Sequence, residues 1–142
     1  MIAVINKEKN MKERNTRQKD IITDIMMKTK CHPTAREVCQ MVKQVDSSIG
    51  QATVYRQLHR LLSDGKIRCV ATIDGEDHYD WNTSFHAHFV CNRCHQIYDV
   101  VVETKEQKRL FQFMPHLVLD SNITAHGLCE KCLKEDNNEI SV

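Results

Sequence analysis

The sequence has little aromatic content, almost no net charge, no internal repeat and no long apolar run. Aromatic residues make up 6% of its 142 residues, and the formal net charge is +1. No apolar run approaches the roughly 20 residues of a membrane helix, and the N-terminus lacks the charged-then-apolar pattern of a signal peptide. We therefore expect one ordinary domain or two small ones in the cytoplasm, without a membrane partner.

Cysteine is the residue type that stands out. The chain contains seven cysteines and eight histidines. Disulfides are rare in a reducing cytoplasm, so this number of cysteines indicates metal binding rather than a disulfide framework.

The small net charge hides a strong asymmetry along the chain. Residues 1–68 carry fourteen Lys/Arg against seven Asp/Glu, a net charge of +7, whereas residues 69–142 carry six against twelve, a net charge of −6. A basic front half and an acidic back half indicate two modules with different partners. The partner of the first would be a polyanion such as nucleic acid, unless the segregation is chance.

The front half predicts three short helices. Residues 1–14 are polar and charged, so we expect a flexible leader before a first helix that begins at Asn15 or Thr16. Thr34 is followed three residues later by Glu37, a capping box that starts a second helix. A third helix follows, with apolar residues on one face and hydrogen-bonding residues on the other.

A two-stranded hairpin completes a winged helix-turn-helix over residues 1–82. Strands near Ile67–Ile73 and His78–Trp81 are joined by Asp74-Gly75-Glu76, and Asp-Gly is a strong hairpin signal. In this arrangement the third helix, 51–63, enters the DNA major groove, although a solvated surface helix is the alternative. The residues expected to contact DNA are Gln51, Thr53, Tyr55 and Arg56 on the third helix, and Arg17 and Lys19 on the first.

Residues 83–142 predict a small α/β domain, which makes the whole chain α+β. Strands are expected over Phe85–Val90 and Gln96–Val102, with a last strand near Leu117–Ala125. Between them, Thr104 and Gln107 predict a capped helix.

Two pairs of cysteines predict a structural zinc site in this domain. Cys91-x-x-Cys94 and Cys129-x-x-Cys132 are separated by 34 residues. Four thiolates complete a tetrahedral zinc shell and leave no position open for a substrate. A redox disulfide pair and an iron–sulfur cluster are the alternatives to one Zn²⁺ per chain. Cys39 has no cysteine at ligand spacing, so we expect it to be a buried small apolar residue.

The histidines that precede the first cysteine pair belong to a different site. Side chains alternate between the faces of a strand, so His86 and His88 point one way and Cys91 points the other. One ion cannot easily take both sets, and the sequence therefore predicts two metal sites that start from one strand.

Carboxylates are available to the histidine pair. Asp80 lies six residues upstream, and Asp99 is expected on the neighbouring strand. Imidazole and carboxylate ligands suit Fe²⁺, Mn²⁺ or Zn²⁺. His32 is a candidate ligand from the front half, although spacing does not show that it reaches the others. Two histidines and a carboxylate also resemble a non-haem iron oxygenase site, but the chain has no room for a substrate barrel.

Three motifs carry a resemblance to a known family. They are Ala52-Thr53-Val54-Tyr55-Arg56-Gln57-Leu58, His86-x-His88-x-x-Cys91-x-x-Cys94 and Cys129-x-x-Cys132. With His32-Pro33-Thr34-Ala35, they make residues 14–133 resemble the Fur family of metal-dependent repressors. The resemblance implies a homodimer built through the back half, double-stranded operator DNA as partner, and one regulatory Fe²⁺ or Mn²⁺ per chain. It also implies the regulatory ligands His32, Asp80, His86, His88 and Asp99.

The carboxylates favour one branch of that family. Aspartate at both Asp80 and Asp99 resembles the peroxide-sensing repressors, whereas iron-uptake repressors usually have glutamate. We therefore expect a repressor, not an enzyme, that is inactivated when iron-driven chemistry oxidises a ligand histidine. By resemblance that histidine is His32 or His86. The alternative is a repressor that responds only to iron, manganese or zinc availability.

Overall fold

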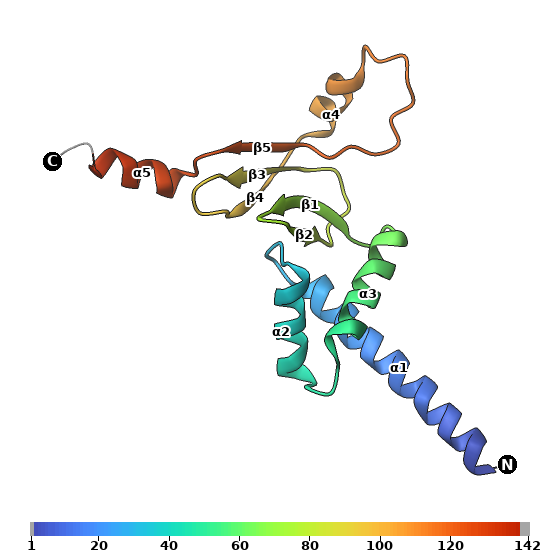
Figure 1. Ribbon diagram of the computed structural model, residues 1–142. Coiled ribbons are helices and arrows are strands. Elements are labelled where there is room, and N and C mark those ends of the chain that lie inside the picture. Colours follow the sequence, from blue (N-terminus) through green and yellow to red (C-terminus); the bar gives the residue numbers. More distant parts are fainter. Residues whose placement is uncertain (1, 140–142) are drawn as a thin grey trace. The chain divides into compact units, whose positions relative to one another are not determined.

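The computed structural model describes residues 2–139, which divide into two compact units. The first unit ends at Thr83 and the second begins at Ser84. Figure 1 shows helices and strands in both units. Within residues 2–139, no helix combines the length and the apolarity that a membrane span requires.

The first unit is a winged helix-turn-helix, as predicted. Its elements are α1 (Ile2–Lys28), α2 (Ala35–Val45), α3 (Gln51–Ser63), β1 (Arg68–Ile73) and β2 (Glu76–Asp80). Thr34 caps α2: its hydroxyl accepts from the Glu37 N–H, and the Glu37 carboxylate accepts from the Thr34 N–H. This confirms the predicted capping box, which satisfies two N–H groups that lack a partner inside the helix.

All three helices contribute to one apolar core. Its members include Ile22 and Met26 from α1, Val38, Cys39 and Val42 from α2, and Val54, Leu58 and Leu61 from α3. Burial of these side chains is the main stabilising contribution in a unit of this size. Cys39 is among them, which confirms that it is a buried apolar residue.

The first helix differs from the prediction. We expected a flexible leader over residues 1–14, but α1 is continuous from Ile2 to Lys28. Burial begins only at Gln18, so residues 6–17 are helical without packing against the core. Seven of these twelve residues are Lys, Glu or Arg, which favour helix through local propensity alone.

The wing is an antiparallel pair whose turn follows from its residues. Asp74 and Gly75 both have positive φ, 52° and 79°, as the central residues of a type I′ hairpin require. The wing is joined to the α1–α2 connection by the Tyr79 N–H, which donates to the Pro33 carbonyl, and by the indole N–H of Trp81, which donates to the Thr29 carbonyl.

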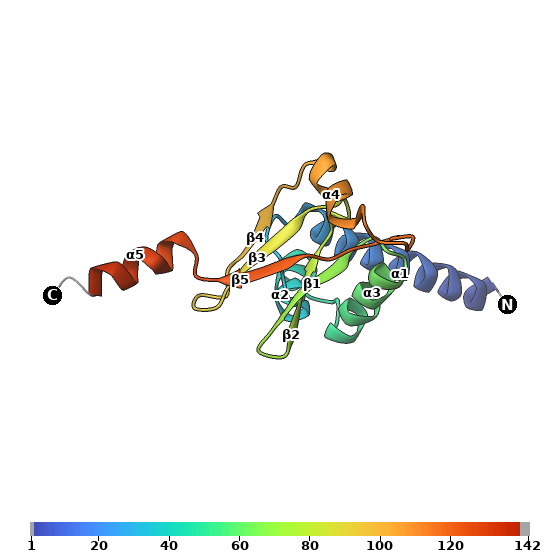
Figure 2. The same cartoon turned by 90° about the horizontal axis from the view of Figure 1, so that it is seen from above.

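The second unit is a small mixed sheet with two helices. Its elements are β3 (Ala87–Cys91), β4 (Ile97–Val100), α4 (Thr104–Phe111), β5 (Thr124–Gly127) and α5 (Glu130–Glu139). The strand order is β4-β3-β5, with β3 antiparallel to β4 and parallel to β5 (Figure 2). The predicted α/β class is therefore confirmed.

Two local predictions in this unit were wrong. The last strand covers only Thr124–Gly127, because only this stretch pairs with β3. Thr104 lies inside α4 rather than at its N-cap, and the N-cap residue Glu103 makes no side-chain capping bond.

Candidate metal centres

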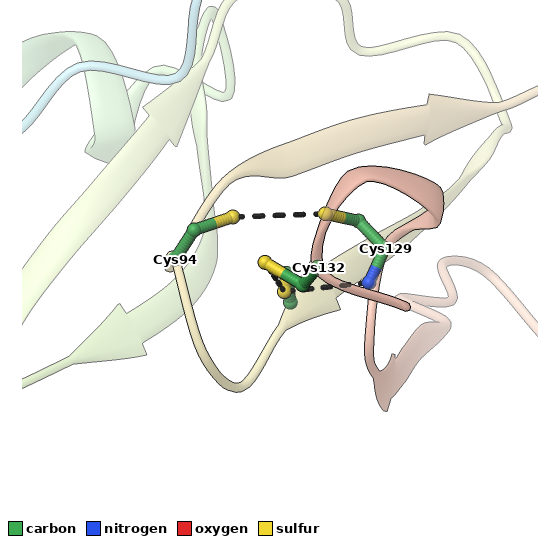
Figure 3. Close-up of side chains that lie close together, drawn as sticks. Cys94, Cys129 and Cys132 are labelled. Atoms are coloured by element: carbon green, nitrogen blue, oxygen red, sulfur yellow. Dashed lines mark hydrogen bonds between the residues drawn. The ribbon is translucent and has the colours of Figure 1, made fainter. Parts of the chain in front are cut away.

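The four predicted zinc ligands converge in the second unit. Ligand atoms of Cys91, Cys94, Cys129 and Cys132 all lie within 4.8 Å of one another. The Cys94 and Cys129 sulfurs are 3.8 Å apart (Figure 3). The Cys91 and Cys132 sulfurs are also 3.8 Å apart. A tetrahedron with Zn–S bonds of about 2.3 Å has sulfurs about 3.8 Å apart, so these residues fit a zinc ion.

Strand pairing produces this convergence. Cys91 ends β3 and pairs with Gly127 at the end of the parallel strand β5. Cys94 lies in the turn from β3 to β4, while Cys129 precedes α5 and Cys132 lies in its first turn. Parallel strands end at the same edge of a sheet, so both cysteine pairs come to that edge.

Backbone N–H groups stabilise the thiolate form of two of the cysteines and so lower their pKa values. The N–H groups of Cys94 and Cys129 lower the pKa of Cys91 to about 6. The N–H of Cys132 lowers the pKa of Cys129. Burial acts in the opposite direction on Cys132 and raises its pKa to about 12. Thiolates are the zinc ligands, so ion binding and proton release are coupled here.

Three further side chains surround the sulfurs. Arg93 donates to the Cys132 carbonyl and pairs with Asp136 of α5. Phe89 packs against the cysteine cluster. The neighbouring Cys129 side chain is the largest cause of a Tyr98 pKa raised to about 12.

Sequence reasoning missed these surrounding residues, although strand alternation carried a signal for one of them. Tyr98 precedes Asp99, so it lies on the opposite face of β4. Its cross-strand partner is Phe89, which shares a face of β3 with Cys91. An antiparallel register would therefore have placed Tyr98 on the sulfur side.

The second unit also brings together three of the predicted nitrogen and oxygen ligands. His88 pairs with Asp99 across β3 and β4. The Asp99 Oδ1 lies 3.4 Å from the His88 Nε2 and 3.5 Å from the His86 Nε2. The two imidazole rings have centroids 4.5 Å apart. Two imidazoles and one carboxylate thus converge on one face of the sheet, as strand alternation predicted.

The first unit brings together the other two. The His32 Nε2 lies 3.8 Å from the Asp80 Oδ2, and both side chains are buried. His32 is held by the connection after α1, where its carbonyl oxygen lies 2.7 Å from the His78 Nδ1. The other Asp80 oxygen, Oδ1, accepts from the Asn82 N–H at 2.8 Å. Each unit therefore contains histidine and carboxylate side chains in contact.

The residues predicted to contact DNA lie on α1 and α3. Gln51, Tyr55, Arg56 and Arg17 are exposed, whereas Thr53 and Lys19 are half-buried. A hollow of about 230 Å³ lies between the two helices, with Lys19, Arg56 and Arg60 among its lining residues. Across the described part of the chain, no carboxylate lines this hollow. Arg60 had not been predicted as a contact.

The chain matches known proteins over most of its length. Residues 10–115 match the model of the ferric uptake regulator family. The peroxide-responsive repressor PerR of Staphylococcus epidermidis is 29% identical over 130 residues, which cover 87% of this chain and 84% of that protein.

Solved structures agree with this match. The Campylobacter jejuni peroxide stress regulator is 26% identical, with a TM-score of 0.74 over 90% of this chain and 98% of that one. The Helicobacter pylori ferric uptake regulator Fur, at 17% identity, shares the fold with a TM-score of 0.71 over 94% of each chain. The chain belongs to the ferric uptake regulator family, whose members are DNA-binding transcriptional regulators rather than enzymes.

Proposed function

We propose that this chain is a homodimeric repressor that binds double-stranded operator DNA in the cytoplasm when a regulatory Fe²⁺ or Mn²⁺ is bound. We propose further that peroxide oxidises the iron-loaded form and releases the DNA. The observation that carries the proposal is that both units present ligands suited to such ions. They are His32 and Asp80 in the first unit, and His86, His88 and Asp99 in the second.

Neither ligand set is sufficient alone for an ion with five or six ligands. Shared binding of one ion by both sets would restrict the angle between the units, and with it the spacing of the two α3 helices in a dimer. An equilibrium shifts only through a difference in affinity between its states. A hundredfold preference for the DNA-binding arrangement contributes about 2.7 kcal/mol per site, which is enough for a nearly balanced equilibrium.

The proposed DNA surface is the exposed side of α3 together with the adjoining part of α1. Gln51, Thr53 and Tyr55 offer hydrogen-bonding and aromatic groups for base edges. Lys19 and Arg56 line the basic hollow, which suits a backbone phosphate. Arg17 adds a further cation on the exposed face of α1.

The proposed homodimer rests on apolar exposure in the second unit. Val101, Phe113 and Leu117 are 90%, 89% and 85% exposed, and Leu119 is 86% exposed. Isolated apolar residues on a surface need no explanation, but several large ones within twenty residues indicate a surface that another chain covers. A second copy is the partner that the family resemblance implies, and structural Zn²⁺ at the four cysteines would keep that surface folded.

The proposed peroxide response depends on the imidazole rings of the histidines in the two ligand sets. Iron, when bound, supplies the electrons that reduce peroxide next to its ligands. His32 and His86 present imidazole nitrogens that lose their affinity for the ion once the ring carries an added oxygen. Loss of a histidine ligand would then weaken the link between the units and DNA binding with it.

Binding of DNA by the loaded protein tests the proposal. The probe is a duplex selected from a random pool by the Mn²⁺-loaded protein, and binding is followed by fluorescence anisotropy. We expect binding to need Fe²⁺ or Mn²⁺ and to be lost after peroxide only with Fe²⁺. Peptide mass spectrometry should then find one added oxygen atom on the peptide that contains His32 or His86.

Two variants make the test specific. His32→Ala should abolish metal-dependent DNA binding, whereas His116→Ala, an exposed histidine outside both ligand sets, should not change it. Retained DNA binding by the iron form after peroxide would reject peroxide sensing and leave a repressor that responds to metal availability. DNA binding that is independent of metal would reject the proposal as a whole.

A further inference from the structure

We propose that two side chains of the wing, those of His78 and Trp81, hold the connection between α1 and α2 so that the His32 imidazole faces Asp80. His78 lies on β2, and Trp81 follows the last residue of this strand. The inference rests on the proposed function, in which His32 and Asp80 are ligands of the regulatory ion. His78 and Trp81 are positioning residues, because each acts on the ion only through the segment that carries a ligand.

Two hydrogen bonds join the end of the wing to this connection at separate points. The Trp81 indole N–H donates to the Thr29 carbonyl at 2.9 Å. The Tyr79 N–H donates to the Pro33 carbonyl at 3.0 Å. Together they close a ring of two short backbone segments, one from the connection and one from the wing. Each segment carries one ligand of the first unit, so the ring restricts the backbone of both.

A third contact acts on the ligand residue itself. The His78 Nδ1 lies 2.7 Å from the His32 carbonyl oxygen. A carbonyl oxygen is only an acceptor, so the ring nitrogen is the donor. Pro33 follows His32, is fully buried and restricts the residue before it to an extended backbone. The His32 backbone is thus fixed by its neighbour in the sequence and by a side chain of the wing.

The Trp81 bond satisfies a carbonyl at the end of a helix. α1 ends at Lys28, and Thr29 follows it. The last carbonyls of a helix have no partner within the helix, so they need donors from elsewhere. The Trp81 ring is 41% exposed, so its contribution to apolar burial is limited. Its N–H therefore gives this residue a specific contact that a phenylalanine would lack.

The result is that the two ligands of the first unit lie close together. The His32 Nε2 lies 3.8 Å from the Asp80 Oδ2, and each side chain is 7% exposed. These contacts are all made by the protein, so they order the ligands independently of the ion and reduce the entropy lost on binding. If a released connection oriented His32 correctly about one-tenth of the time, the apparent affinity for the ion would fall about tenfold.

Removal of both side-chain links tests the proposal in the zinc-loaded full chain. Trp81→Phe keeps an aromatic ring without the N–H, and His78→Leu removes the ring nitrogen. We expect the double variant to bind Mn²⁺ about tenfold more weakly in a calorimetric titration, and each single variant to lose less. In Mn²⁺-free protein, the Tyr79 amide should exchange its hydrogen faster in the double variant, because its bond to the Pro33 carbonyl is no longer supported by the other two.

Two controls separate positioning from stability. His78→Asn retains a donor at the place of Nδ1 and should bind Mn²⁺ like the parent. Thr72→Val removes a hydrogen bond to Asp77 elsewhere in the wing, so it should lower stability without changing the affinity for Mn²⁺. If His78→Asn weakened binding as much as His78→Leu, donation to the His32 carbonyl would not be the role of His78, and the proposal would be overturned.

This inference and the proposed function fail in different ways. If His32→Ala weakens Mn²⁺ binding but the double variant does not, His32 is a ligand that needs no positioning by the wing, and only the inference is overturned. If His32→Ala leaves Mn²⁺ binding unchanged, His32 is not a ligand, and the proposed function is overturned together with the inference. Should the double variant fail to fold, the single variants decide, and unchanged Mn²⁺ affinity in both would overturn the inference.

Discussion

The sulfur atoms of Cys91 and Cys132 lie 3.8 Å apart, although the two residues are 41 positions apart in the sequence. A zinc ion at this position would join the end of β3 to the first turn of α5. The second unit has a small core, so we expect this cross-link to be required for its folding.

Cys132→Ser should therefore lose zinc and unfold the second unit while the first unit keeps its helices. Zinc content per chain and the loss of far-ultraviolet circular dichroism, which should be partial, measure the two effects. Cys31→Ser is the matched control, because Cys31 is exposed and lies in the first unit. A folded Cys132→Ser protein that retains no zinc would contradict the structural role of the ion.

Asp99 is the carboxylate that lies within 3.5 Å of both His86 and His88. Asp99→Ala should weaken binding of Mn²⁺ by about 10-fold to 100-fold or more, because it removes one ligand and the acceptor that orients two others. Calorimetric titration measures the loss, and zinc content should not change. Asp120→Ala, an exposed aspartate of the same unit, is the control. Equal Mn²⁺ affinity in both variants would remove Asp99 from the ligand set.

The capping box at the start of α2 gives a prediction for stability. Thr34→Ala leaves the Glu37 N–H without its acceptor and should lower the free energy of unfolding of the first unit by about 1 kcal/mol. Urea denaturation followed by Trp81 fluorescence measures the change, because Trp81 is the sole tryptophan and lies in this unit. Thr16→Ala, on the exposed part of α1, should cost much less.

Cys39 predicts how the first unit responds to alkaline pH. Burial raises the pKa of its thiol above the ordinary value of 9.0, and Lys43 offsets part of this shift. Because the folded pKa is above the unfolded one, the thiol's contribution to stability is fully present below pH 9.0 and is lost as pH rises through the raised pKa. Cys39→Ala should flatten the decline in unfolding free energy above that pH, and an unchanged slope would show that other groups cause it.

Arg60 tests the basic hollow between α1 and α3. If this hollow binds a backbone phosphate, Arg60→Ala should weaken binding of different duplexes by a similar factor and should reduce the salt dependence by about one unit of slope. Arg36→Ala is the control, because Arg36 already pairs with Glu76 of the wing. A variant that changes sequence preference instead would place Arg60 at a base edge.

The sequence predicted most accurately the elements whose signals are local. Gln51–Ser63 was predicted with its observed bounds, because the apolar and hydrogen-bonding faces of α3 are evident from residues close together in the sequence. The capping box at Thr34 and the turn at Asp74 and Gly75 were predicted for the same reason. Each depends on side chains within four positions of one another.

The errors have two physical causes. The first half of α1 is helical by propensity without an apolar stripe, so periodicity gave no sign of it. The extent of β5 is set by its parallel partner β3, which lies more than thirty residues earlier. Pairing of this kind also explains why the position of Tyr98 opposite Phe89, on the sulfur side of the sheet, was missed. The register between strands that are far apart in the sequence determines such contacts, and no local sequence pattern indicates that register.

The strand β3 and the residue before it place the two histidines of the proposed regulatory site on one face and Cys91 of the four-cysteine site on the other. A deletion or insertion of one residue between His88 and Cys91 would therefore invert the facing of everything beyond it. Either the imidazoles or the sulfurs would then point away from their own partners. The number of residues between the two motifs is thus constrained by both sites, and a change in it would disrupt at least one of them.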